Sequence, residues 1–552
     1  MLAALAGKWI VGLTFLALTT ILLIHTFFVA GAPYSGSAKT GPRKGRSAII
    51  TAATHTAAGL ARTARGMARS ARKVRLIEPQ GRAARPLNAW ISRWPLLGPI
   101  TLATILERRG YDVAVYNENF SGPLDADGDA YADVCSADVV GISIMTPTAN
   151  RGYALADRVR REAPDTTVVI GGVHATMCPH EAAEHADIVV CGEGETVIED
   201  IAAGGITSGI IQAGRLENLD EIPPLNHFLV RDFDKLLASC RKRNLYELPV
   251  MTSRGCPHNC TYCSVTRMFG RKVRRQSVEK VHSDLQHYAR QGFTTLFFYD
   301  DNFTTDRRWT VALLERLRPM RLRFNMQCRV DFHWIDAARR RRDDQLLRRM
   351  QAAGGSTMYI GYETLDERTA RKWHKGYQGG QTLPQRLRED TRILHDHGFW
   401  IHGMFVLGPQ HTAPVARNIV NFARGVEMES LQISILTPLP GTPMMDELRD
   451  HLVFNRFPAD WDYYDGTHCV YDHSRLGIEG FQRAVFNAHR DFYIRGVWNA
   501  RALRWVAARR ISVLDKVREL WAGTRSAGQI MRKWRAETRE FLKEVRVRTA
   551  AR

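Results

Sequence analysis

The sequence predicts an α/β protein with two parallel-sheet units in series, followed by a basic, helical carboxyl-terminal region. Short apolar, β-rich runs alternate with amphipathic helical patterns from residue 73 to residue 215, and the same alternation resumes after residue 246. At 552 residues the chain is too long for one ordinary hydrophobic core. The first unit is therefore expected to be a doubly wound sheet, and the second a partial (β/α)6 barrel.

The composition is that of a globular protein whose positive charge lies at its two ends. Hydrophobic residues make up 45% of the chain and charged residues 24%, with a net charge of +20. Residues 33–75 carry ten Lys or Arg and no acidic residue, and residues 496–552 carry fifteen basic against five acidic side chains. The middle is nearly neutral, so no nucleic-acid partner is expected. The nine cysteines form no disulfide framework, which favours a reducing compartment.

Residues 1–72 are predicted to form a hydrophobic membrane anchor and a basic helical linker. Trp9–Ala32 is free of charged residues apart from a titratable His25, and as a helix it would span ~36 Å. Basic residues gather after this run, which predicts a chain held at the cytoplasmic side of the inner membrane. A cleaved signal peptide and a wrongly chosen start codon are the alternatives. After the apolar run, four arginines spaced three or four residues apart would share one face of a helix, which could contact solvent or acidic lipid headgroups. They are Arg62, Arg65, Arg69 and Arg72.

Residues 73–215 are predicted to form the doubly wound sheet. Strands such as ADVVGISIMT and TTVVIGGVHAT alternate with helices such as NRGYALADRVRREAP. Ligands of such sheets bind beyond the carboxyl ends of the strands. No G-x-G-x-x-G follows the first strand, which weakens a dinucleotide-binding interpretation. Small and polar candidates for cofactor contact lie at the strand ends: Ser143, Thr146, Gly171, Gly172, His174 and Glu193.

A linker at residues 216–245 leads to SRGCPHNCTYCSV, which holds Cys256, Cys260 and Cys263. A structural zinc site is not expected, because it needs four protein ligands and no C-x-x-C or H-x-x-H pair lies nearby to complete the tetrahedron. Three thiolates instead suit a [4Fe-4S] cluster that leaves one iron open. An open iron can chelate S-adenosylmethionine (SAM), and reduction then releases a 5′-deoxyadenosyl radical.

Residues 246–450 are predicted to form the partial barrel, with its site at the carboxyl ends of the strands. The strand before the cysteines is LPVMTSRG. Five further strand-like runs alternate with amphipathic helical patterns: TLFFYDDN, RFNMQCRVD, MYIGYET, WIHGMFVLG and SLQISILTP.

The spacing C-x-x-x-C-x-x-C, with Tyr262 before the last cysteine, resembles the signature of the radical SAM superfamily. In front of it, the order GISIMTPT, GGVHAT, CGEGE resembles the Rossmann-like cobalamin-binding domain that precedes many such enzymes. The resemblance covers about residues 73–445 and implies three cofactors: a [4Fe-4S] cluster, SAM and cobalamin. The Asp-x-His-x-x-Gly motif that supplies a cobalt ligand elsewhere is absent. His174 is therefore expected to be a loop histidine at the ligand edge or in solvent.

The resemblance also implies where SAM is held. The second barrel strand ends in residues expected at the methionyl amino group, although a helix N-cap is the alternative. The fourth strand ends in residues expected at the ribose. The implied contacts are Asp300, Asp301, Asn302, Glu363 and Thr364. GMFVLG (403–408) matches a glycine motif that could serve packing alone, and TPLPGTP (437–443) matches an adenine-lining loop. Cys328 is expected to be a buried apolar residue.

Residues 451–552 are predicted to form a substrate-pocket segment and a basic amphipathic helical region. DWDYYDGTHCVYDH (460–473) is expected near the open barrel mouth. The helical region shows apolar faces that suit packing on the domain or a membrane interface. They consist of Leu514, Val517 and Trp521, and of Trp534, Phe541 and Val545.

The function expected from this resemblance is cobalamin-dependent C-methylation of an unactivated carbon on a hydrophobic, lipid- or hopanoid-like substrate. A reducing partner such as flavodoxin or ferredoxin, and a membrane surface, are the implied partners. The alternative is a non-methylating oxidation, cyclisation or carbon–carbon coupling on a tetrapyrrole or lipid. A non-catalytic cobalamin or iron–sulfur sensor is a further alternative. RNA modification is disfavoured by the neutral middle of the chain.

Overall fold

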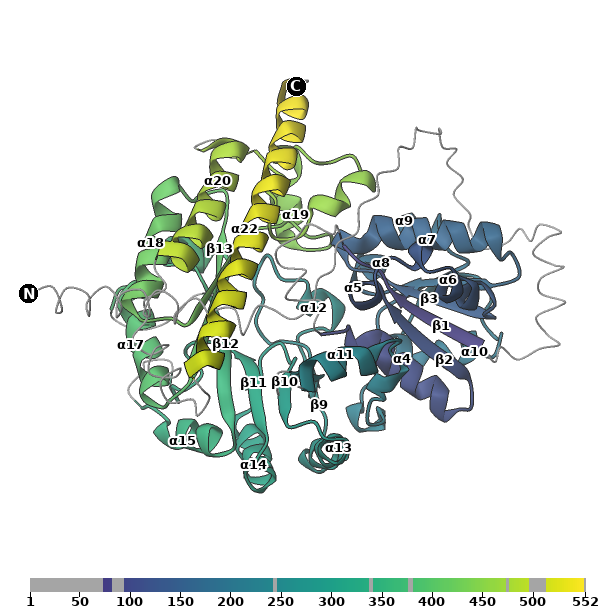
Figure 1. Cartoon of the computed structure of the whole chain (residues 1–552), viewed down its shortest axis with the longest axis horizontal. Coiled ribbons are helices and arrows are strands. Elements are labelled where there is room, and N and C mark those ends of the chain that lie inside the picture. The colour runs from purple at the N-terminus through teal and green to yellow at the C-terminus, as the bar shows by residue number, and fades with distance from the viewer. Residues whose placement is uncertain are drawn as a thin grey trace, which may run out of the picture.

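The computed structural model describes residues 73–81, 94–241, 246–336, 341–375, 381–472, 476–495 and 513–550. These residues form two six-stranded sheets with helices around them, side by side in one molecule (Figure 1). The predicted anchor at Trp9–Ala32 and the arginine-bearing helix before residue 73 lie outside the described residues. Within those described ranges, no helix combines the length and the apolar character needed to cross a membrane.

The first sheet is parallel, with the strand order β2-β1-β3-β4-β5-β6, which confirms the predicted doubly wound architecture. The runs VVGIS and TVVIG form its two central strands, and their side chains are largely buried, as expected for a sheet covered on both faces. The strands are β1 (Lys73–Glu78), β2 (Asp112–Asn117), β3 (Val139–Ser143), β4 (Thr167–Gly171), β5 (Ile188–Cys191) and β6 (Gly209–Gln212). The helices around it are α4 (Leu97–Arg108), α5 (Glu118–Ser121), α6 (Gly128–Cys135), α7 (Ala149–Glu162), α8 (Val173–Met177), α9 (Pro179–Ala183) and α10 (Ile198–Ala202).

The fourth strand is shorter than the sequence predicted. TTVVIGGVHAT was expected as one strand, but β4 ends at Gly171 and His174 lies in α8. Gly172 has a φ of 99°, and a Cβ atom there would lie 2.6 Å from the Ile144 carbonyl oxygen. Glycine therefore permits the chain to turn at this point. The expectation of a loop histidine at a ligand edge or in solvent is wrong, because His174 is helical and completely buried.

The second sheet is also parallel, in the order β14-β13-β12-β11-β10-β7, which confirms the predicted partial barrel. Its strands are β7 (Leu248–Val250), β10 (Thr295–Phe298), β11 (Arg323–Cys328), β12 (Gly355–Glu363), β13 (Trp400–Leu407) and β14 (Ser430–Ile435). Amphipathic helices connect them: α13 (Val278–Arg290), α14 (Arg307–Leu317), α15 (Asp344–Ala352), α16 (Glu367–Lys372), α17 (Leu383–Asp396) and α18 (Ala413–Gly425). Outside this sheet, β8 (Ser253–Arg254) and β9 (Arg274–Arg275) form a short antiparallel pair. In the sequence, α12 (Val265–Met268) lies between these two strands.

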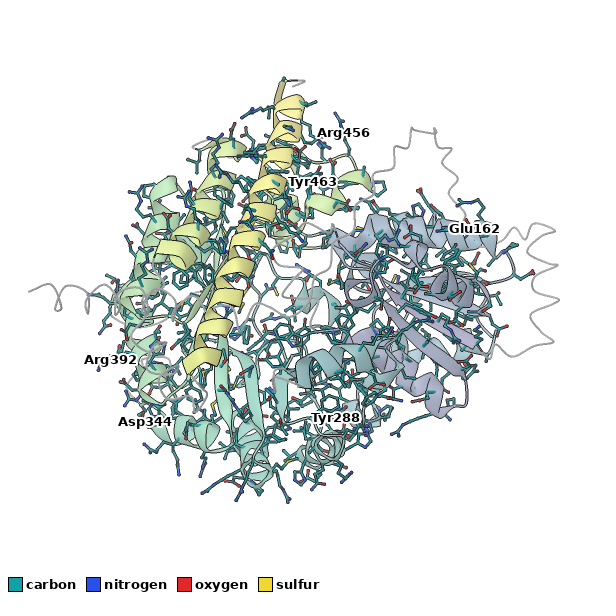
Figure 2. The ribbon with its side chains drawn as sticks, viewed as in Figure 1. Glu162, Tyr288, Asp344, Arg392, Arg456 and Tyr463 are labelled. Carbon is teal, nitrogen blue, oxygen red and sulfur yellow. The ribbon has the colours of Figure 1, made fainter. Side chains whose placement is uncertain are left out.

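The segment between the two sheets and the carboxyl-terminal region both pack on this framework. Helix α11 (Phe233–Arg241) lies in the segment expected to be a linker, and Phe233 is buried. After α19 (Pro443–Leu448), α20 (Gly477–Arg490) packs on β14 and α18, and α22 (Val513–Ala550) packs on α20. Trp534 and Phe541 are buried, so the later part of α22 packs on the domain, as one of the two interpretations predicted. Tyr463 lies beside this helix (Figure 2), with its ring centroid 5.4 Å from that of Phe541.

Candidate active site

The carboxyl ends of the two sheets face the same region between the domains. Glu193 follows β5, and its Oε2 accepts a hydrogen bond from Arg254 Nη1 of β8 at 2.8 Å. Gly441, in the loop after β14, lies so close to α8 that a Cβ atom on it would be 2.5 Å from Met177 Sδ. Ligands of parallel sheets bind at these strand ends. The two sets of residues predicted to bind cofactors therefore belong to one region.

The three predicted cluster ligands lie on the loop after β8, as free and partly buried cysteines. Gly255 has a φ of 93°, and a Cβ atom there would lie 2.6 Å from the Lys272 carbonyl oxygen, so the turn before Cys256 requires glycine. The Cys263 amide donates to the Cys260 carbonyl at 3.2 Å. The Tyr262 ring packs edge-on against Trp373, at 5.6 Å between ring centroids. A hydrogen bond within the loop and a ring contact with Trp373 thus help to fix its conformation.

The chemistry of this donor set fits a [4Fe-4S] cluster. Burial, together with the neighbouring Cys260 and Asp301 charges, raises the pKa of Cys263 to about 12. Burial also raises the pKa of Cys256, so these thiols ionise readily only when a cationic metal group replaces their protons. Three thiols leave one iron of such a cluster open. In the parts of the chain that the structure describes, no three His, Cys, Asp or Glu side chains gather as a single-ion site requires.

The predicted acidic residues after β10 divide into two roles. Asp300 is buried and accepts hydrogen bonds from the Thr252 hydroxyl at 2.9 Å and from the Ser253 hydroxyl, which ties β10 to the strand that enters the cysteine loop. Asp301 is accessible to solvent at its surface. The many protein atoms around it still partly desolvate its carboxylate, and together with the Asp300 charge this raises the pKa of Asp301 to about 7. Asp301 is thus the member of this pair placed to meet a ligand.

The helix-cap alternative for these residues is not what the structure shows. Helix α14 begins at Arg307, and its N-cap is Asp306, whose side chain accepts from the Trp309 amide. Asn302 is buried, and its Oδ1 accepts from the Thr304 hydroxyl at 3.2 Å.

The predicted ribose contacts end β12 in an unusual conformation. Glu363 has a φ of 63°, which non-glycine residues seldom adopt and which recurs at functional sites. Its carboxylate pairs with Lys375. Thr364 is buried, and its Oγ1 lies 3.4 Å from His411 Nε2. Both predicted residues therefore lie at the carboxyl end of the fourth barrel strand, as expected.

The glycines of GMFVLG serve close packing. A Cβ atom on Gly403 would lie 2.1 Å from Met428 Sδ, and one on Gly408 would lie 2.6 Å from Trp373 Cζ2. Cys328 is buried on β11, as predicted.

Of the residues predicted to contact a cofactor at the first sheet, all but Glu193 lie close together. Gly172 lies against Ser143, at 3.2 Å between a Cβ atom built on the glycine and the serine Oγ. His174 Nδ1 lies 3.2 Å from Thr146 Oγ1, and its Nε2 lies 3.0 Å from Glu181 Oε1. Gly171 ends β4 beside them. Glu193 stands apart, because both of its carboxylate oxygens are held by arginines of the second domain.

These strand ends fit cobalamin bound without a histidine on the cobalt. The small residues Ser143 and Gly171 are partly accessible, and a Cβ atom on Gly171 would meet only ordinary contacts, at 3.7 Å. Both ring nitrogens of His174 are already engaged. This agrees with the absence of the motif that would supply such a ligand.

The segment expected at the barrel mouth docks on this first domain. Trp461 Nε1 donates to both carboxylate oxygens of Glu181 at 3.0 Å, and its ring lies edge-on to His174. The Asn150 side-chain amide donates to Asp462 Oδ1 at 3.1 Å. Residues 459–463 therefore help to join the carboxyl-terminal region to the first sheet.

Sequence reasoning missed the side chains on the inner face of the barrel. On β14, Gln432 and Ser434 are partly accessible while the intervening Ile433 is buried, and β13 shows the same alternation. The Gln432 side chain joins His402 at 3.4 Å and donates to Ser434 Oγ at 3.0 Å. Aromatic rings lie on the same sheet, with 4.9 Å between the centroids of Phe297 and Tyr359. The period-two alternation in WIHGMFVL and SLQISI was the signal that could have identified this face.

An open parallel barrel with a three-thiol loop, beside a doubly wound domain, defines the class of iron–sulfur radical enzymes with a second cofactor. Residues 92–202 match the B12 binding domain family, and residues 250–423 match the Radical SAM superfamily. The chain therefore belongs to the radical SAM superfamily and carries a B12-binding domain. These matches confirm the predicted cofactors: cobalamin, a [4Fe-4S] cluster and SAM.

Two relatives match over most of their length, and a third over less. The chain is 26% identical to bacteriochlorophyllide d C-12(1)-methyltransferase of Chlorobaculum tepidum, over 79% of this chain and 91% of that protein. It is 24% identical to bacteriochlorophyllide d C-8(2)-methyltransferase of the same organism, over 71% and 86%. It is 26% identical to the hopanoid C-2 methylase of Rhodopseudomonas palustris, over 39% of each chain.

Solved structures share the fold. The cobalamin-dependent SAM radical enzyme OxsB, with aqua-cobalamin and SAM bound, superposes with a TM-score of 0.57 at 13% identity, covering 86% of this chain and 80% of that one. The radical SAM methyltransferase TsrM of Kitasatospora setae, with cobalamin and a [4Fe-4S] cluster bound, superposes with a TM-score of 0.54 at 17% identity, covering 69% and 75%.

Proposed function

We propose that this protein is a cobalamin-dependent methyltransferase that adds a methyl group to an unactivated carbon of a hydrophobic substrate. One observation above all supports this: the loop after β5 in the B12-binding domain contacts, through Glu193 and Arg254, the strand that leads into Cys256. A reaction that uses both cofactors requires such proximity. When bound, the cluster with SAM supplies the hydrogen-abstracting 5′-deoxyadenosyl radical, and cobalamin supplies the methyl group.

The chain's own residues have distinct tasks in this proposal. Cys256, Cys260 and Cys263 would hold the cluster, and Asp300 holds the strand before them. Asp301 would help to hold the methionyl end of SAM. The other predicted residues would line the two cofactor sites: Asn302, Glu363 and Thr364 in the barrel, and Ser143, Thr146, Gly171 and Gly172 in the first domain.

The inner face of the barrel supports a substrate that is hydrophobic but carries hydrogen-bonding groups. Met404 and Val406 of β13 are partly accessible, and they lie beside Gln432 and Ser434 of β14, so this face offers apolar as well as polar contacts. Gln432 and Ser434 would lose their hydration against a purely hydrocarbon substrate, which is unfavourable. A tetrapyrrole-like macrocycle satisfies both surfaces better than a saturated hopanoid ring does. The two relatives matched over most of their length are named for methylation of bacteriochlorophyllides.

The test is an anaerobic assay of the purified full chain, reconstituted with iron, sulfide and hydroxocobalamin. SAM is added in excess, and dithionite, or reduced flavodoxin as the proposed physiological reductant, supplies electrons. A bacteriochlorophyllide and a hopanoid are offered separately, and S-adenosylhomocysteine, 5′-deoxyadenosine and the mass of the product are measured. We expect both nucleoside products and a gain of one methyl group on the bacteriochlorophyllide. Formation of 5′-deoxyadenosine without S-adenosylhomocysteine would instead support non-methylating oxidation or cyclisation.

We further propose that Trp9–Ala32 anchors the protein at the cytoplasmic side of the inner membrane, where hydrophobic substrates concentrate. The absence of charged residues from this run and the basic residues after it support the proposal. Full-length protein should remain in the membrane pellet after carbonate extraction. Its release into the supernatant would contradict the anchor without affecting the proposed chemistry.

A further inference from the structure

Two arginines and two glutamates form a buried, electrically balanced group between the two domains. Arg254 Nη1 donates to Glu193 Oε2 at 2.8 Å, and its Nη2 donates to Glu195 Oε1 at 2.6 Å. Arg274 Nη1 also donates to Glu193 Oε2, at 2.9 Å, and its Nη2 pairs with Glu193 Oε1. The exposed fractions of the four side chains are between 1% and 6%.

The two arginines belong to the hairpin at the base of the cysteine loop. Arg254 and Arg274 are register partners in the antiparallel pair of β8 with β9. Arg254 precedes Cys256 by two residues, and the Cys256 amide donates to the Gly270 carbonyl within the same hairpin at 3.3 Å. Movement of this hairpin would therefore move the first cluster ligand.

The glutamates belong to the loop at the carboxyl end of β5, and this loop is held firmly. Gly192 has a φ of 98°, and a Cβ atom there would lie 3.0 Å from the Ala213 carbonyl oxygen. The Leu216 amide donates to Glu193 Oε2 at 3.2 Å, and the Leu216 carbonyl accepts from Arg274 Nη1 at 2.7 Å. Both sides of the ionic group are thus attached to defined backbone.

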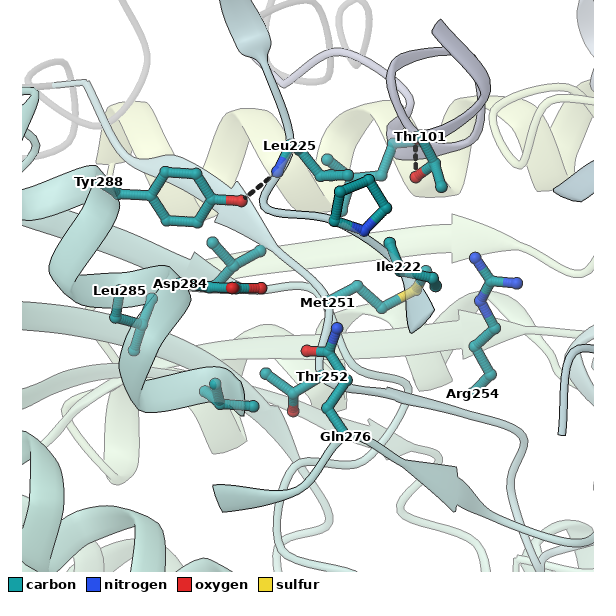
Figure 3. Close-up of a pocket in the computed structure, with 14 residues that line it drawn as sticks. Thr101, Ile222, Leu225, Met251, Thr252, Arg254, Gln276, Asp284, Leu285 and Tyr288 are labelled. Atoms are coloured by element: carbon teal, nitrogen blue, oxygen red, sulfur yellow. Dashed lines mark hydrogen bonds between the residues drawn. The ribbon is translucent and has the colours of Figure 1, made fainter. Parts of the chain in front are cut away.

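A small cavity borders the ionic group on one side. Arg254 lines this cavity together with Thr101 of α4, Met251 and Tyr288 (Figure 3). The cavity volume is about 30 Å³, which suits a single water molecule. On this side of the ionic group, α4 of the first domain therefore lies close to the start of the barrel.

We propose that Glu193 is a positioning residue: through Arg254 and Arg274 it holds the cysteine loop at a defined place relative to the cobalamin-binding domain. This inference rests on the proposed function, which needs the two cofactors held close together. Both carboxylate oxygens of Glu193 are engaged by guanidinium groups, so the residue acts through the protein and not by contact with cobalamin. Ionic pairing with fixed geometry specifies one relative arrangement of two surfaces more sharply than apolar contact does.

The experiment compares Glu193→Gln and Arg274→Lys in the full chain, with Glu199→Gln as the matched control. Glu199 lies in α10 of the same domain and pairs with Arg109 at 3.0 Å, but the exposed fractions of the two side chains are 42% and 64%. Amide hydrogen exchange of residues 253–275 is measured on the apoprotein, and hydroxocobalamin affinity is measured by absorbance titration. The reconstituted variants are then assayed for 5′-deoxyadenosine per methylated product.

We expect exchange of residues 253–275 to accelerate by about ten-fold or more in Glu193→Gln. The increase should be smaller in Arg274→Lys, which keeps the charge but loses the forked geometry, and absent in Glu199→Gln. Hydroxocobalamin affinity should stay within about two-fold of the unchanged protein, because no contact with cobalamin is removed. The 5′-deoxyadenosine formed per methylated product should rise, because hydrogen abstraction continues while methyl transfer is misaligned.

Unchanged exchange in both variants would overturn the proposal, as would a large loss of hydroxocobalamin affinity with unchanged exchange. If Glu193→Gln fails to fold, the same three measurements on Arg274→Lys test the proposal: exchange of residues 253–275, hydroxocobalamin affinity and 5′-deoxyadenosine per methylated product. Failure of the proposed function is distinguishable from these outcomes. Unchanged protein that never forms S-adenosylhomocysteine would refute methylation and leave the exchange result standing.

Discussion

Glu363 Oε1 lies 3.0 Å from Lys375 Nζ, and the exposed fraction of each side chain is 11%. The pair depends on Gly361, because a Cβ atom there would lie 2.3 Å from Glu363 Oε1 and 3.2 Å from Lys375 Nζ. It also borders the cysteine loop: burial raises the pKa of Cys256, and the Lys375 charge partly opposes that rise. The end of β12 and the cluster site are therefore electrostatically connected.

Lys375→Met should destabilise the apoprotein by about 3–5 kcal/mol, because it leaves the Glu363 carboxylate nearly buried without its cation. The matched control is Lys372→Met. Lys372 pairs with Glu447 at 2.5 Å, but the exposed fractions of these side chains are 52% and 41%, so its loss should cost about 1 kcal/mol or less. Denaturant unfolding under anaerobic conditions measures both. Equal losses in the two variants would contradict the role assigned to the buried pair.

Alanine substitution of Cys256, Cys260 or Cys263 should remove most of the iron and sulfide bound after reconstitution and abolish SAM cleavage. Each thiolate holds one iron of the proposed cluster, so the loss of any one leaves a second iron without a protein ligand. Cys135→Ala is the control, since Cys135 is partly buried at the end of α6 in the other domain. Iron analysis and electron paramagnetic resonance provide the measurement. Full iron content in any single cluster variant would refute that ligand.

The raised pKa of Glu78 predicts that the free energy of unfolding depends on pH. Burial raises its pKa from 4.5 to about 7, despite hydrogen bonds from the Leu96 amide and from the Asn117 and Asn119 side chains. Between pH 4.5 and pH 7 the folded protein holds a proton that the unfolded chain releases. The stability contribution of the protonated form is therefore complete below pH 4.5 and is lost as pH rises through 7.

Glu78→Gln cannot titrate and should lack this loss. Relative to the unchanged protein, its unfolding free energy should gain on the order of 3 kcal/mol between pH 4.5 and pH 7.5. Unfolding of the apoprotein across this pH range measures the difference, whatever the offset between the two proteins at pH 4.5. Parallel curves for the two proteins would contradict the raised pKa.

Both sheets and the cysteine loop could be predicted because their signals are local. Strands such as TVVIG and SLQISI are short apolar runs between helices, and the three cysteines lie within eight consecutive residues. The prediction that one strand would extend through His174 was wrong, and the reason is also local. Gly172 turns the chain at a point where the apolar pattern continues, and the pattern alone does not report a positive φ.

The partners of the site residues could not be predicted because they are distant in sequence. Glu193 is separated by 61 residues from Arg254 and by 81 residues from Arg274. Its place at a strand end suggested a cofactor contact, and only the packing of the two domains reveals the arginines. Glu181 and Trp461 are 280 residues apart. Such ion pairs follow from domain arrangement, which periodicity and spacing do not encode.

Trp461→Phe should weaken the docking of the carboxyl-terminal segment on the B12-binding domain. Trp461 is 3% exposed and donates to the Glu181 carboxylate, so phenylalanine keeps most of the ring but removes a charge-assisted hydrogen bond worth about 1.5–3 kcal/mol. The control is Trp309→Phe, which removes a bond of 2.9 Å to the neutral Gln276 carbonyl, worth about 0.5–1.5 kcal/mol. Unfolding free energies and proteolysis of residues 451–472 should both show the larger effect for Trp461. A larger effect for Trp309 would mean that the Glu181 contact does not hold this segment in place.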